Sequence, residues 1–117
     1  MPLDEGDLSF LFDMLECCTD VLDFTSNVSY EQYAADKMRR LATERRLETL
    51  GEAANHVSLV CQAKSPDIDW SRIIGLRNKL AHDYGEVLAE RVWQITQNHI
   101  PTLRARLTVI LSLASDG

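Results

Sequence analysis

Apolar residues recur at helical spacing along almost the whole chain, and this periodicity constrains the fold more than any other feature of the sequence. In the first segment Leu8, Leu11, Leu15 and Leu22 follow the period of an α-helix, and most acidic side chains lie elsewhere around the axis. Signals for β-strands are few. The pattern predicts an amphipathic first helix of about five or six turns and an all-α protein.

The second predicted helix is long. It begins near Tyr30 or Asp36 and ends at Ala63, before Pro66, because proline disfavours helical geometry in the residue that precedes it. Gly51 lies inside this helix, where glycine costs about 1 kcal/mol relative to alanine. We therefore expect a neighbouring helix to approach closely at Gly51.

A short third helix and a longer fourth helix complete the expected fold. Asp67 or Asp69 caps the third helix, and residues 83–85 then turn the chain. The fourth helix covers residues 87–112 or so, and Pro101 kinks it or splits it in two. Short connections favour an antiparallel bundle, so we predict a single domain over residues 1–117, built as a bundle of four to five helices.

The formal net charge of −6 is distributed unevenly. Residues 1–36 carry nine acidic side chains and no basic one, whereas residues 37–106 carry twelve basic and eight acidic side chains. The net charge argues against a nucleic acid partner, but the mildly basic remainder permits an anionic ligand. The acidic cluster, taken alone, is typical of a solvated helix face.

The cysteines and the first residues of the sequence indicate a cellular compartment. Cys17, Cys18 and Cys61 show no C-x-x-C spacing, and one is left over in any disulfide scheme, which favours a reduced protein. The sequence begins without a basic region or an apolar signal core, and no apolar stretch is long enough to cross a bilayer. We expect a cytoplasmic protein that does not enter a membrane.

Arg77 and His82, near the end of the third predicted helix, are candidates for chemistry. RNA cleavage without a metal needs a base for the 2′-hydroxyl proton, an acid for the leaving 5′-oxygen and a cation for the phosphoryl charge. Histidine titrates near neutral pH, and arginine presents a planar fork to phosphate oxygens. Taken alone, the same two residues also fit a surface ion-pair arginine and a histidine favoured at a helix C-terminus.

The spacing of the pair sets a geometric condition. Five residues along a regular helix separate Arg77 and His82 by about 140° around the axis. His82 must therefore lie where the helix frays or turns, or the cleft must be assembled from two chains.

A polar stripe of Arg45, Glu48 and Glu52 lies on one face of the second predicted helix. These side chains either line a ligand cleft beside Arg77 or face solvent, as charged helical residues usually do.

The remaining histidines and both tryptophans are expected to be structural. His56 and His99 lack partners at metal-ligand spacing, so the sequence predicts no metal site and no cofactor. Trp70 and Trp93 occupy positions that suit helix packing, and we expect them in the core.

Two segments together resemble the HepT-like branch of the HEPN superfamily, which occurs in prokaryotic HEPN/MNT toxin–antitoxin pairs. Residues 45–53 read R-x-L-E-x-L-G-E-A, similar to the second-helix signature of that family. Residues 68–84 read I-x-W-x-x-I-I-G-L-R-N-x-L-x-H-x-Y, similar to its defining segment. The resemblance covers nearly the whole chain.

The resemblance implies a HEPN-type bundle that forms a homodimer and brings two copies of the Arg-x4-His motif to a shared cleft. It implies a metal-independent endoribonuclease in which Arg77 stabilises the scissile phosphate and His82 is the general base or acid. Asn78 would orient the phosphate or the histidine. Tyr84 would be the tyrosine to which a nucleotidyltransferase antitoxin transfers AMP, silencing the toxin. The implied partners are a second copy of the chain, an MNT-type antitoxin and RNA.

One alternative function stays open, and the sequence departs locally from the family pattern. The alternative is a non-catalytic HEPN module that binds a nucleotide or is the dimerising partner subunit of a nucleotidyltransferase, since fold alone does not decide function. The departure is Asp83, whose carboxylate is expected to raise the pKa of His82 or to weaken attraction for RNA. Gly85 also shortens the aromatic stretch after Tyr84.

Overall fold

The computed structural model describes residues 4–116 and contains helices but no strand in that range. The helices are α1 (Glu5–Thr25), α2 (Tyr30–Ala35), α3 (Lys37–His56), α4 (Leu59–Ala63), α5 (Trp70–Ile74), α6 (Leu76–Ala81), α7 (Gly85–Asn98) and α8 (Ile100–Asp116). The prediction of an all-α fold is confirmed.

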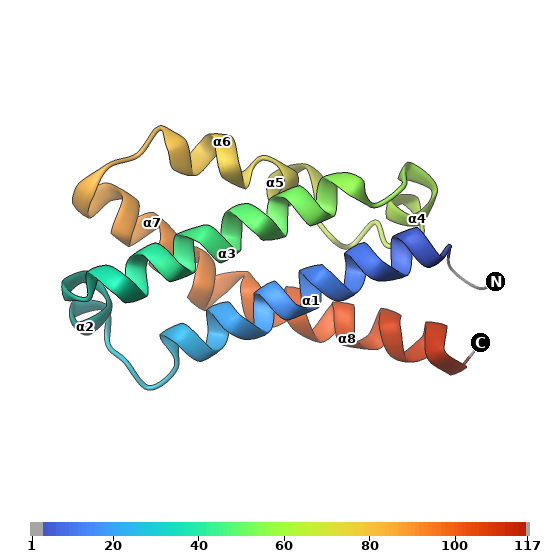
Figure 1. Cartoon of the computed structure of the whole chain (residues 1–117), viewed down its shortest axis with the longest axis horizontal. Coiled ribbons are helices and arrows are strands. Elements are labelled where there is room, and N and C mark those ends of the chain that lie inside the picture. Colours follow the sequence, from blue (N-terminus) through green and yellow to red (C-terminus); the bar gives the residue numbers. More distant parts are fainter. Residues whose placement is uncertain (1–3, 117) are drawn as a thin grey trace.

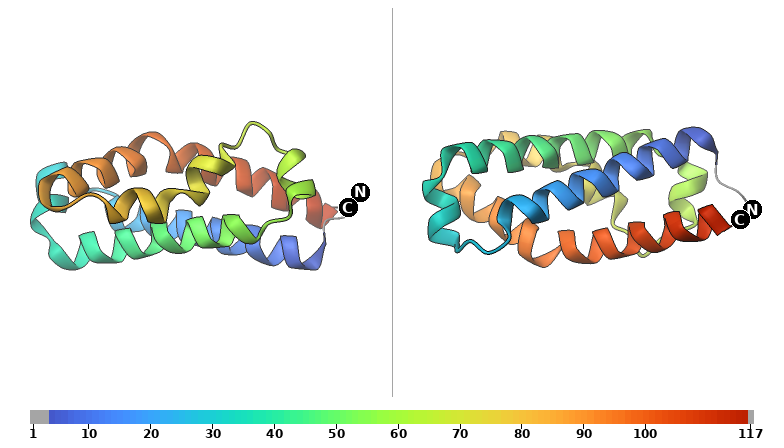
Figure 2. Two further views of the ribbon diagram at one scale, coloured as in Figure 1. Left: turned by 90° about the horizontal axis from the view of Figure 1, so that it is seen from above. Right: turned by 60° about the horizontal axis from the view of Figure 1, so that its bottom comes forward.

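The long helices form an elongated bundle with dimensions of 46 × 28 × 21 Å. Figure 1 shows α1 running antiparallel to α3 and α8, with α5 and α6 along the far side of α3. Helix α7 packs against α2 and α8, and α1 begins at the same end of the bundle where α8 finishes (Figure 2). The antiparallel bundle expected from the short connections is therefore present.

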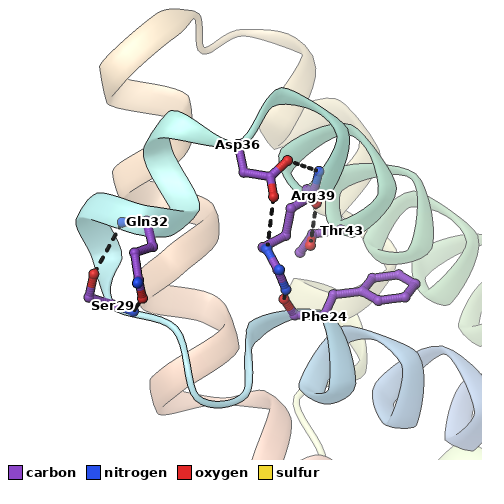
Figure 3. Close-up of polar contacts among 6 residues, drawn as sticks. All are labelled: Phe24, Ser29, Gln32, Asp36, Arg39 and Thr43. Atoms are coloured by element: carbon purple, nitrogen blue, oxygen red, sulfur yellow. Dashed lines mark hydrogen bonds and ion pairs between the residues drawn. The ribbon is translucent and has the colours of Figure 1, made fainter.

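The predicted second helix is divided at its start by side-chain caps (Figure 3). Ser29 and Gln32 form a capping box on α2: the Gln32 amide donates to Ser29 Oγ at 3.1 Å, and the Ser29 amide donates to Gln32 Oε1 at 2.8 Å. Asp36 has an extended backbone and caps α3 by accepting from the Arg39 amide at 3.1 Å. Arg39 also donates to the Phe24 carbonyl oxygen, which ties the end of α1 to α3.

A further cap separates α4 from α3. The Ser58 hydroxyl accepts from the Cys61 amide at 3.1 Å and so begins α4. The carboxylate of Asp7, which is buried in α1, accepts from the Ser58 amide at 2.8 Å and from its hydroxyl at 2.7 Å. Local polar groups therefore replace one predicted long helix by three segments.

The third and fourth predicted helices are each split in two. Gly75 ends α5 and precedes α6. Helix α7 ends at Asn98, and Pro101 lies in the first turn of α8, where its missing N–H costs least. Of the two outcomes expected at Pro101, a kink or a split, the structure shows the split.

Trp70 lies in the core as predicted, whereas Trp93 is partly buried and packs against the core from its edge. Trp70 is buried, and its indole N–H donates to the Ser65 carbonyl oxygen at 3.1 Å. The ring centroid of Trp93 lies 6.0 Å from that of Tyr30 and 5.4 Å from that of Tyr33.

The three cysteines are buried free thiols. Burial raises the pKa of Cys17 to about 11 and the pKa of Cys18 to about 12. In the part of the chain that the structure describes, no helix has the length and apolar character needed to span a membrane.

Candidate active site

Helix α6 presents the motif residues to solvent. Leu76 and Leu80, one turn apart, are buried and hold the helix against α3. Arg77 and Asn78 occupy the outward side of the same helix and are exposed. The packing of α6 thus leaves its polar residues available for a ligand.

His82 lies where the helix ends. This is the first of the two alternatives derived from its spacing to Arg77, a helix that frays or turns at His82. It is the C-terminal cap of α6, and its amide donates to the Lys79 carbonyl oxygen at 3.4 Å. The next amide, that of Asp83, donates to the Leu80 carbonyl oxygen at 3.3 Å. Both bonds span three residues, so the last turn is tighter than a regular α-helix.

Tyr84 lies in the short connection between α6 and α7. Its backbone is extended, and 81% of the residue is exposed. Gly85 follows with a φ of 55°, a left-handed conformation that favours glycine. The connection therefore turns sharply while Tyr84 points into solvent.

The motif side chains have no partners among residues 4–116. The side chains of Arg77, Asn78, His82 and Tyr84 make no hydrogen bond, ion pair or ring contact with any other described residue. These four exposed side chains lie within a span of eight residues, and each can donate or accept hydrogen bonds. They are thus available to an external ligand.

Asp83 is engaged differently from the expectation. Its carboxylate is paired with the guanidinium of Arg91 in α7, and the Asp83 side chain is only 16% exposed. No hydrogen bond joins it to His82 among the described residues. Arg91 was not identified from the sequence, because an eight-residue separation across a turn corresponds to no regular helical contact.

The predicted polar stripe on α3 makes no polar contact with Arg77 in the described part of the chain. Arg45 and Glu48 form an ion pair at 3.6 Å, and both side chains are solvent-accessible. Neither they nor Glu52 forms a hydrogen bond or ion pair with Arg77 in the described residues. Their role in lining a cleft stays a prediction.

The two histidines expected to be structural differ in their surroundings. The His56 ring stacks on Phe10 with centroids 4.8 Å apart. His99 caps the end of α7 and lines a groove. No group of three or more potential metal-ligating side chains from His, Cys, Asp and Glu occurs in residues 4–116.

A groove of 910 Å³ lies between α5–α6 and α7–α8. Its wall on α6 includes Lys79, whereas Arg77 lies roughly 160° away around the helix axis. None of the predicted site residues lines it. Arg106 on α8 donates to Asp67 at the groove edge, and this hydrogen bond lowers the pKa of Asp67.

Comparison with known proteins connects this arrangement to a family. Residues 14–110 match the family model described as "Ribonuclease HepT-like". A protein of Methanocaldococcus jannaschii named "Putative RNase" is 32% identical over 87% of this chain and 94% of its own length. A second protein of that organism with the same designation is 33% identical over 88% of this chain and 85% of its own length.

A more distant relative carries the family name itself. The "Probable ribonuclease HepT" of Thermococcus cleftensis is 29% identical over 83% of this chain and 88% of its own length. No solved structure matches the chain significantly.

Proposed function

The chain belongs to the HepT-like ribonuclease family, and from this premise we propose that it is a metal-independent endoribonuclease, the toxin of a HEPN/MNT toxin–antitoxin pair. The observation that carries the proposal is the pair of Arg77, in the first turn of α6, and His82, at its C-terminal cap, both exposed and without a side-chain partner among the described residues. Both side chains are therefore accessible to an external phosphate, as the proposed chemistry requires.

The chemistry proposed for the site is intramolecular transesterification of RNA. His82 removes the proton from a 2′-hydroxyl group, and the 2′-oxygen forms a bond to the neighbouring phosphorus. The bond from phosphorus to the 5′-oxygen breaks, and that oxygen takes a proton from an acid. Arg77 stabilises the charge on the non-bridging oxygens, and Asn78 orients the phosphate.

A homodimer supplies the acid in this scheme. The scheme needs a base and an acid, and each chain supplies one histidine in the motif, so we propose that two chains share the cleft. Two copies joined at α6 place two arginines and two histidines in one cleft. One His82 is then the base, and the His82 of the other copy is the acid.

Regulation is proposed to act through Tyr84. Its hydroxyl attacks the α-phosphorus of ATP held by an MNT-type nucleotidyltransferase antitoxin, a phosphodiester forms, and pyrophosphate leaves while the phenolic proton passes to a base. The exposure of Tyr84 makes it accessible to such an enzyme. The added phosphodiester places negative charge beside the RNA site and blocks it.

Intact mass after co-expression tests the pairing and the modification. The chain is produced together with an MNT-type nucleotidyltransferase, and we expect AMP additions on the wild-type chain that are lost in Tyr84→Phe. Tyr30→Phe is the matched control, because the Tyr30 hydroxyl oxygen is buried. Additions that persist in Tyr84→Phe would overturn the assignment of the site.

Growth arrest provides the corresponding test of the toxin. We expect arrest when the wild-type chain is expressed alone and no arrest with Arg77→Ala or His82→Ala. Arg72→Ala is the control, since it removes an exposed arginine from the neighbouring helix α5. A fully toxic variant at either motif position would contradict the proposal.

A further inference from the structure

The connection of residues 82–85 carries two of the motif side chains, yet helix packing does not fix it directly. Helix α6 packs against α3, whereas α7 packs mainly against α2 and α8. In the described part of the chain, the connection makes one side-chain hydrogen bond to a helix, from Arg91 Nε to Asp83 Oδ2. This bond joins the middle of the connection to the second turn of α7.

The pair is shielded enough to hold a defined geometry. Asp83 and Arg91 side chains are 16% and 39% exposed, so water and salt screen their attraction less than that of a fully exposed pair. The Asp83 amide is held as well, through its bond to Leu80. The amide of Asp83 is therefore bonded to α6, and its carboxylate is bonded to α7.

We propose that the Asp83–Arg91 ion pair is a positioning clamp for the active site. His82 and Tyr84 are the two chain neighbours of Asp83, so fixing Asp83 fixes the directions in which their side chains leave the backbone. Neither side chain has a partner of its own among the described residues. The clamp also keeps the Asp83 carboxylate on Arg91, away from Arg77 and from an incoming phosphate.

The effect on cleavage, which rests on the proposed ribonuclease function, is measurable as a rate. Arg91→Ala is expected to lower kcat about tenfold or more, because small misplacements of a catalytic group are costly, while KM changes little. The charge-exchanged protein Asp83→Arg/Arg91→Asp is expected to recover part of that loss. Arg91→Lys, which keeps the charge, is expected to retain more of the wild-type kcat than the charge-exchanged protein does.

A second ion pair offers a matched control. Arg106 Nε donates to Asp67 Oδ2 at 2.6 Å and joins a loop to α8, remote from the motif in sequence. Arg91 and Arg106 both line the groove, so Arg106→Ala tests for any general effect of removing a groove cation. We expect Arg106→Ala to leave kcat within about twofold of the wild-type value.

Amide hydrogen exchange of residues 82–85 tests the clamp without any activity assay. We expect faster exchange in Arg91→Ala and unchanged exchange in Arg106→Ala. Unchanged exchange in Arg91→Ala overturns the clamp. Faster exchange with an unchanged kcat overturns its catalytic role. Wild-type protein that cleaves no RNA overturns the ribonuclease proposal and this catalytic role together, while exchange still decides whether the ion pair orders the connection.

Discussion

Gly51 in α3 faces the carbonyl oxygen of Ile73 in α5 so closely that a Cβ on Gly51 would lie 2.8 Å from that oxygen. The Ile74 carbonyl oxygen and the Leu76 Cβ would lie at 3.5 and 3.7 Å. The junction of α5 and α6 therefore rests directly on α3. This contact confirms the close approach predicted at Gly51, and it places the helix that carries Arg77.

Replacement of Gly51 by alanine tests this contact. In an isolated helix, glycine to alanine would stabilise the helical state by about 1 kcal/mol. Here we expect it to lower the free energy of unfolding by about 1–3 kcal/mol, because backbone atoms of α5 must move. Urea unfolding measures the change. Thr49→Ala, which removes a hydroxyl bonded only to Arg45 of the same helix, is the near-neutral control. A stabilised Gly51→Ala protein would contradict the close contact.

The bond between Asp7 and Ser58 gives a second stability prediction. Asp7→Ala removes the acceptor for both the amide and the hydroxyl of Ser58. We expect a loss of about 1–3 kcal/mol in unfolding free energy, since buried hydrogen bonds to a carboxylate are strong. Asp13→Ala changes an exposed carboxylate of the same helix and is expected to alter stability by less than about 0.5 kcal/mol. Equal effects of the two substitutions would contradict the structural role of Asp7.

The buried thiols predict how stability depends on alkaline pH. In the unfolded chain Cys17 and Cys18 lose their protons near pH 9, whereas in the native protein their pKa values are about 11 and 12. Native protein therefore binds more protons near and above pH 9, so stability falls as pH rises, by about 0.7 kcal/mol per pH unit for each thiol at pH 9 and by up to about 1.4 kcal/mol per pH unit once the unfolded thiol is fully ionised. Urea unfolding between pH 8 and pH 10 measures the slope, which should flatten in Cys17→Ala/Cys18→Ala. An unchanged slope in this variant would contradict the account.

A mixed dimer tests the shared cleft. In a dimer of one wild-type chain and one Arg77→Ala/His82→Ala chain, only one His82 remains, so either the base or the acid is missing. We therefore expect the purified mixed dimer to cleave RNA far more slowly than the wild-type dimer. A stable mixed dimer that keeps about half of the wild-type rate would show that each chain holds a complete site of its own.

The sequence was sufficient to predict the fold class and the position of the motif. Helical periodicity identified the bundle, and glycine at position 51 identified a close helix contact. Helix boundaries were less predictable, because short-range caps at Asp36 and Ser58 interrupt a segment whose apolar pattern continues. Such caps compete with continuation of the helix because the side chain bonds to backbone groups that would otherwise bond within the helix.

The roles of the candidate site residues stay predictions, and the ion pair beside them was not foreseen from the sequence. The spacing of Arg77 and His82 left two alternatives, a helix end at His82 or a cleft assembled from two chains, and the structure shows His82 at a helix end. The pairing of Asp83 with Arg91 depends on the left-handed turn at Gly85, which determines the direction in which α7 leaves the connection. A sequence pattern alone does not specify that direction, so the carboxylate was expected to act on His82 or to weaken the attraction for RNA.

Cleavage of RNA by purified protein in the presence of EDTA tests the central claim most directly. The account predicts that wild-type protein produces fragments with 2′,3′-cyclic phosphate and 5′-hydroxyl ends. Arg77→Ala and His82→Ala should each cleave at least about 100-fold more slowly while keeping the wild-type circular dichroism spectrum and melting temperature. Wild-type cleavage rates in either folded variant would contradict the assignment of Arg77 and His82 as catalytic residues.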